Sequence, residues 1–155
     1  MATLQLYGKV GANFLGGEVA GDTFAIDYLS DTIKATLHTT TYAPNVDTDE
    51  LFAAATNELS TANGYTAGGV TLGTKTVVYD APSGVTTFDC ADFSWTASGG
   101  SLVFRYVVFW RDATDDVLIG YLDVTGSGNF TLNDGNTFTV ATGASGLFTA
   151  DVTGA

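Results

Sequence analysis

The chain has 155 residues, of which 17 are Asp or Glu and five are Lys or Arg, so its formal net charge is −12. Such a surface repels phosphate backbones and anionic lipids, and the composition therefore argues against nucleic-acid binding and against peripheral membrane binding. The length is typical of one domain with its own core, and a charged fraction of only 14% indicates a folded protein with few charges on its surface.

The first 29 residues show no clear hydrophobic period, because glycines interrupt it repeatedly. We expect residues 1–29 to form either an arm that packs on a neighbouring molecule or the first strands of the same domain. They lack the charged and apolar regions of a secretory signal, and the single Cys90 allows no intrachain disulfide. These features predict synthesis and folding in a reducing cytoplasm.

Aromatic residues in the weakly periodic segments are candidates for contact with a partner, because aromatic side chains are enriched at protein interfaces. The alternative is that they belong to the core of the domain. The candidates are Tyr7, Phe14, Phe24, Tyr28 and Tyr42.

Residues 32–39, TIKATLHT, alternate apolar and polar side chains, which is the period of a half-buried strand. They predict a strand whose Lys34, Thr36 and His38 face solvent. Apolar side chains then recur at helical spacing, and Asp47 with Glu50 resembles a capping box. This second pattern predicts one short α-helix over about 48–59.

From residue 70 onward, apolar runs alternate with turn-forming segments, and this pattern predicts three successive hairpins. Their turns are expected at APSG (81–84), DATDD (112–116) and GASG (143–146). Frequent β-branched and aromatic residues separated by short turns favour a mainly β fold. We expect residues 30–155 to form a β-rich domain, an antiparallel β-sandwich or barrel with one short α-helix.

The run SLVFRYVVFWR over 101–111 is mostly apolar on both of its faces, which is typical of a central strand. Both faces can pack within the chain, or one face can be covered by a partner. In the second case Val103, Val107 and Phe109 lie under a neighbouring subunit.

The acidic turn after this run places Arg111 beside Asp112, Asp115 and Asp116. We interpret it as a solvent-exposed hairpin turn with an ion pair at its rim. A calcium loop is the alternative, but DATDDV lacks the regular alternation of ligands and the glycine of an EF-hand loop.

The sequence offers little for catalysis or for a cofactor. His38 is the only histidine and Cys90 the only cysteine, which are too few soft ligands for a zinc site. A nucleophilic Cys, His and Asp arrangement would need His38 beside Cys90. A buried structural cysteine and a surface histidine are the commoner roles, so we predict a protein that is not an enzyme and holds no metal or cofactor.

Three segments resemble a group of small structural proteins of tailed bacteriophages. They are DTIKATLHTTTYAPNVDTDELFAAATNELS (31–60), GYTAGGVTLGTKTVVYDAPSGVTTFDCADFSWTA (64–97) and RYVVFWRDATDDVLIGYLDV (105–124). The resemblance implies a virion component made in the host cytoplasm, of the capsid decoration (cement) or head-fibre type. It also implies binding to the major capsid protein on the capsid exterior, and a homo-oligomer, with a trimer preferred over a dimer.

An alternative within the same resemblance is a tail- or fibre-associated adhesin that binds a host receptor or glycan. Such a module needs an exposed aromatic platform, for which the candidates are Tyr65, Tyr79, Trp95 and Trp110.

Overall fold

The computed structural model describes residues 4–15 and 24–151, and it is mainly β. A five-stranded antiparallel sheet has the order β1-β9-β8-β2-β3. Its strands are β1 (Leu4–Leu6), β2 (Ile33–His38), β3 (Val70–Thr71), β8 (Tyr106–Arg111) and β9 (Val117–Asp123). The first strand of the chain is thus paired at the edge of this sheet, with Leu4 opposite Leu122.

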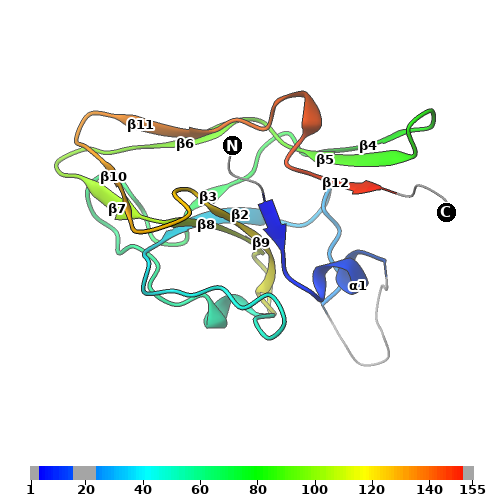
Figure 1. The fold of residues 1–155 in the computed structure, drawn as a ribbon, viewed down its shortest axis with the longest axis horizontal. Coiled ribbons are helices and arrows are strands. Elements are labelled where there is room, and N and C mark those ends of the chain that lie inside the picture. The colour runs from blue at the N-terminus through cyan, green and yellow to red at the C-terminus, as the bar shows by residue number, and fades with distance from the viewer. Residues whose placement is uncertain (1–3, 16–23, 152–155) are drawn as a thin grey trace.

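The remaining described strands form three smaller antiparallel sheets, ordered β10-β7, β11-β6 and β12-β5-β4. The strands are β4 (Thr76–Asp80), β5 (Val85–Asp89), β6 (Phe93–Thr96), β7 (Leu102–Phe104), β10 (Phe130–Leu132), β11 (Thr137–Val140) and β12 (Phe148–Asp151). In Figure 1 the β11-β6 and β12-β5-β4 sheets form a layer above the five-stranded sheet. The antiparallel sheets confirm the predicted mainly β fold. The described strands do not close into a barrel, so of the two predicted architectures the fold is sandwich-like.

The main hydrophobic core lies between the two layers. Central strands contribute the fully buried Ala35, Leu37, Val107 and Phe109, and the second layer contributes Trp95 among others. Edge-to-face contact of the Phe93 ring with the Phe109 ring joins β6 to β8, with 6.0 Å between the ring centres. Burial of such aromatic residues is the largest favourable contribution to folding in a domain of this kind.

A second, smaller core lies on the opposite face of the five-stranded sheet. There Tyr106, Val108 and Trp110 of β8 are covered by the connection that includes Tyr42 and Phe52. The Phe52 ring stacks on the Trp110 ring, with 4.1 Å between their centres and 13° between their planes. The central strands are therefore buried on both faces.

Burial on both faces corrects the prediction of a wet face on the 32–39 strand. Thr36 and His38 are 0% exposed, and Lys34 is half-buried. The alternating pattern correctly predicted the strand itself. Its polar face is buried because the 39–56 connection folds back over it. The alternation of apolar and polar residues over 32–39 does not predict this contact.

The prediction of an α-helix over about 48–59 is wrong. Only η1, a 3-10 turn over Phe52–Ala54, forms there. Leu51 instead has extended backbone and bridges to Val117, where the Phe52 amide donates to the Asp116 carbonyl at 2.7 Å. Pairing with the first residue of β9 thus overrides the helical propensity of this segment.

Short helical elements occur at two places where the sequence pattern did not predict them. They are α1, over Val10–Leu15 in the glycine-interrupted region, and η2, a 3-10 turn over Gly143–Ser145. The segment that contains η2 connects β11 to β12, which do not pair with each other. β11 pairs with β6 and β12 pairs with β5, so the third predicted hairpin is wrong, whereas the β4-β5 and β8-β9 hairpins are confirmed.

The apolar run over 101–111 is two strands rather than one. The chain bends at Arg105, whose amide donates to the His38 carbonyl at 2.7 Å and whose guanidinium binds both carboxylate oxygens of Asp123 at 2.6 and 3.0 Å. Before the bend the even-numbered Leu102 and Phe104 face the main core, and after it the odd-numbered Val107 and Phe109 do.

Candidate functional site

Most of the aromatic residues predicted to contact a partner lie inside the chain. Tyr7, Tyr28 and Tyr42 are each at most 3% exposed, and Phe24 is half-buried against the main core. The side chain of Phe14 lies outside the described residues. The core alternative therefore holds for the three tyrosines, which are not accessible on the surface.

The predicted face of Val103, Val107 and Phe109 does not exist as one surface. Val107 and Phe109 are 0% exposed, whereas Val103 is 38% exposed on β7. The bend at Arg105 separates them, so only Val103 of this group can contact a second molecule.

Tyr7 and Tyr42 form a buried hydrogen-bonded pair that fixes the 42–55 connection against the start of the chain. The Tyr42 hydroxyl donates to Asp49 Oδ2 at 3.0 Å and lies 2.6 Å from the Tyr7 hydroxyl, so Tyr7 donates to Tyr42. Burial is the main reason that the pKa values of both phenols are raised, and both stay neutral. We assign the pair a structural role.

His38 is buried in the second core, against the rings of Tyr42 and Phe52. Its Nδ1 donates to the Thr56 carbonyl at 2.9 Å, and Nε2 lies 3.0 Å from the Thr36 hydroxyl. Burial lowers the pKa of His38, against the smaller opposing effects of the Thr56 carbonyl and the Glu58 charge. The imidazole is therefore neutral and holds β2 to the 56–58 segment.

We expect the free energy of unfolding to decrease as pH falls below about 6.5, the usual pKa of histidine. The unfolded chain takes up the proton first, because the folded state lowers the pKa of His38. His38 is the only histidine, so no second imidazole titrates in this range. Denaturant unfolding at a series of pH values measures the effect, and a His38→Gln variant, which does not titrate, should lose this pH dependence. A wild-type slope that persists in the variant would contradict the assignment.

Cys90 is buried in the main core, on the other side of the five-stranded sheet from His38. Burial, helped by the charge of Asp89, raises the pKa of its thiol to about 11. A thiol with this pKa is protonated near neutral pH and is a poor nucleophile. The structure therefore does not bring His38 and Cys90 together.

The acidic turn differs from its predicted form. Arg111 is 6% exposed, and its guanidinium donates to the backbone carbonyls of Ala25 and Asp115, the latter at 2.9 Å. An ion pair at this turn joins Lys34 to Asp112, at 2.6 Å. Within the described residues no group of three or more His, Cys, Asp or Glu side chains is arranged to hold a metal ion. Arg111 thus anchors the Ala25 segment to the β8-β9 hairpin.

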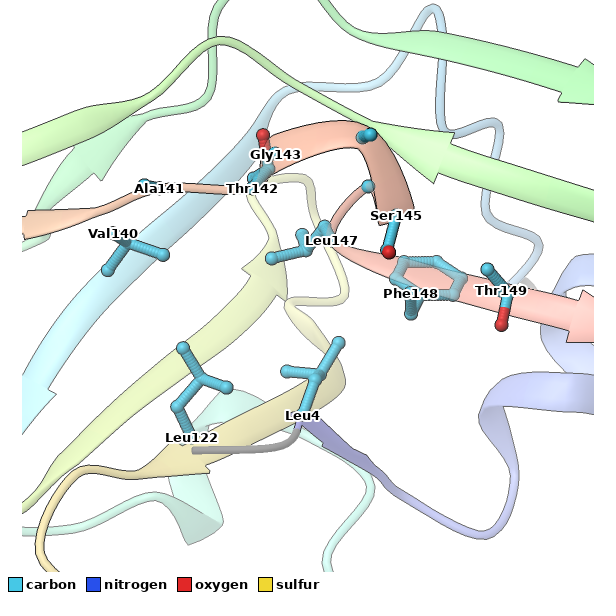
Figure 2. A pocket seen from close by; sticks show the side chains of 12 residues that line it. Leu4, Leu122, Val140, Ala141, Thr142, Gly143, Ser145, Leu147, Phe148 and Thr149 are labelled. Carbon is cyan, nitrogen blue, oxygen red and sulfur yellow. The ribbon is translucent and has the colours of Figure 1, made fainter. Parts of the chain in front are cut away.

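One concave feature of the described chain is an apolar groove at one side of the sandwich. It has a volume of about 540 Å³ and lies between Leu4 and Leu122 of the five-stranded sheet and the connection from Val140 to Thr149. Figure 2 shows the side chains of Leu4, Leu122 and Leu147 converging on it. A smaller hollow of about 250 Å³, beside Val124 and Phe138, shares Leu122, Val140 and Ala141 with it. We name the two together the apolar groove.

Strand β4 is the second exposed apolar feature. All five of its residues are exposed, including Val77 at 37%, Val78 at 59% and Tyr79 at 60%. The sequence predicted the strand but not its exposure, because TVVYD has the composition of a buried strand. β4 lies at the edge of its sheet, and exposed apolar edge strands are seldom left uncovered. Exposed apolar patches commonly mark sites of protein contact. The apolar groove and β4 are therefore both candidates for docking other chains.

No protein-family model, curated protein or solved structure matches this chain. Among the described residues, no helix is long and apolar enough to cross a membrane.

Proposed function

We propose that this protein is a structural component of a bacteriophage virion that docks on the outside of the capsid and stabilises the head. The observation that carries the proposal is the apolar groove, which offers accessible leucine and phenylalanine side chains to another protein chain. The sequence resemblance over 31–124 supports a virion role. The net charge of −12 supports an external position, because packaged DNA repels an acidic protein.

Stabilisation would follow from mass action. A protein that binds the assembled shell, and binds free or unfolded subunits less well, shifts the equilibrium towards the shell. A repeating lattice uses the same contact many times, so a modest contact has a large total effect.

The first experiment is to measure the copy number of this protein in purified virions against the major capsid protein, by quantitative mass spectrometry. A ratio close to that of the capsid protein supports decoration of the shell. A ratio far below it contradicts decoration and places the protein on a tail or fibre.

Filling the apolar groove should weaken capsid binding. Ala141 is exposed and lines both parts of the groove, so we expect Ala141→Trp to reduce binding to decoration-free capsids at least about tenfold, a loss of about 1.4 kcal/mol. Ala113→Trp, at an exposed position of the acidic turn, is the matched control and should bind normally. Co-sedimentation with capsids measures both, and equal binding by the two variants would exclude the groove as the docking site.

The adhesin alternative has less support from the surface. Of its four aromatic candidates, Tyr65, Trp95 and Trp110 are at most 5% exposed, and only Tyr79 is accessible. A single exposed ring does not make the platform that a glycan-binding site of this kind needs.

A further inference from the structure

The outer edge of β4 is an open pairing site. β4 is the last strand of the β12-β5-β4 sheet, and Figure 1 shows its hairpin at the end of that layer. Among the described residues, only β5 pairs with it. The backbone N–H and C=O groups on its other side thus have no strand partner in the described chain, and such groups readily pair with a strand from another molecule.

Within the described residues, this edge lacks the lysine, proline and bulge that commonly prevent pairing, and its one charged residue, Asp80, is at the end of the strand. Natural edge strands are commonly protected by a lysine or proline within the strand, by a bulge or by a covering element. The five residues from Thr76 to Asp80 include no lysine or proline, and their register with β5 has no shift. The side chain of the preceding Lys75 is directed elsewhere, donating to the Asp31 carbonyl and lying over the Tyr28 ring.

The residues of β4 complement themselves in an antiparallel pair. Two-fold symmetry with Val78 opposite Val78 of a second copy places Val77 opposite Tyr79 on the other face of the sheet. Pairs of an aromatic with a β-branched residue are favourable cross-strand pairs. Centring the pair on Tyr79 would instead set the Asp80 carboxylate against Val78, and centring it on Val77 would set Tyr79 against Lys75, which is already engaged.

Charge favours this edge over the rest of the surface for contact between two copies. A chain with a net charge of −12 repels its own copies over most orientations. From Thr76 to Tyr79 the strand is uncharged, and the Val78-centred register sets Asp80 opposite Thr76, so no carboxylate on the strand faces another.

We propose that β4 pairs antiparallel with β4 of a second copy around a two-fold axis at Val78, joining the two β12-β5-β4 sheets into one continuous sheet. This inference does not depend on the capsid proposal. It predicts a dimer through this edge, where the sequence resemblance implied a trimer. The interface is isologous, so the contact closes on itself and does not propagate into fibres.

Analytical ultracentrifugation over a range of concentrations tests the proposal. The wild-type chain should sediment as a dimer in equilibrium with monomer. Val78→Lys places two ammonium groups opposite each other at the axis, and we expect it to weaken dimerisation about 100-fold or more. Val103→Lys introduces the same change at another exposed valine and should dimerise like the wild type. Circular dichroism checks that both variants are folded.

A cysteine at the axis tests the register directly. In the proposed pair the two Val78 Cβ atoms lie close enough for a disulfide, so Val78→Cys should form a covalent dimer under mild oxidation, whereas Val103→Cys should not. Cys90 is buried and should not interfere. A wild-type chain that stays monomeric at every concentration overturns the proposal. So does a Val78→Lys variant that is folded and dimerises normally.

Discussion

Replacing Phe109 by Ala is expected to lower the free energy of unfolding by about 3–5 kcal/mol. Phe109 is 0% exposed, lies in β8 near the centre of the five-stranded sheet and packs against Phe93 of the second layer. Removing its ring leaves a cavity between the two layers that rigid strands on both sides cannot close. Denaturant unfolding, followed by tryptophan fluorescence and by circular dichroism, measures the loss.

Val103→Ala is the control for this experiment, because the sequence pattern placed Val103 and Phe109 on the same strand face. In the structure Val103 is 38% exposed, and we expect its truncation to change the free energy of unfolding by no more than about 0.5 kcal/mol. Similar large losses for both variants would show that the strand continues through Arg105 without a change of face.

Local patterns in the sequence were sufficient to predict β2 and two of the three hairpins, but not β1 or β10. Alternation identified β2, and the turn residues APSG and DATDD identified the β4-β5 and β8-β9 connections. These features depend on the conformational preferences of a few adjacent residues. The sandwich-like class follows from their number and spacing.

The errors occur where distant contacts decide the conformation. Leu51 is extended because it bridges to Val117, and the run over 101–111 bends at Arg105, which bonds to His38 and Asp123. Neither contact leaves a periodic signal in its own segment. His38 was expected on the surface for a similar reason. The alternation of β2 does not show that the connection over 39–56 folds back and buries His38.

The candidate site was less predictable than the fold. The apolar groove combines Leu4, Leu122 and the segment over 140–149, which only the finished sheet order brings together. The exposure of β4 likewise depends on its place at the edge of a sheet, because its composition is that of a buried strand. The aromatic residues that the sequence singled out are mostly core residues, since aromatic enrichment is shared by cores and interfaces.

Gly69→Ala should destabilise the fold by about 2–5 kcal/mol, from backbone strain and steric overlap together. Gly69 precedes β3 and has a φ of +69°, and an added Cβ would lie 1.9 Å from the carbonyl oxygen of Ala35 in β2. Relief of this overlap requires β3 to move away from Ala35, which breaks its pairing with the outer edge of β2. Thermal and denaturant unfolding measure the total cost.

Gly68→Ala separates the two causes. Gly68 also has a positive φ, +88°, but an added Cβ there would meet no atom within 4 Å. It should therefore show the conformational strain alone, about 1–2 kcal/mol, and the remaining difference of about 1–3 kcal/mol should measure the close approach of β3 to β2. Equal costs for the two variants would mean that β3 does not approach Ala35 this closely, and that the five-stranded sheet ends at β2.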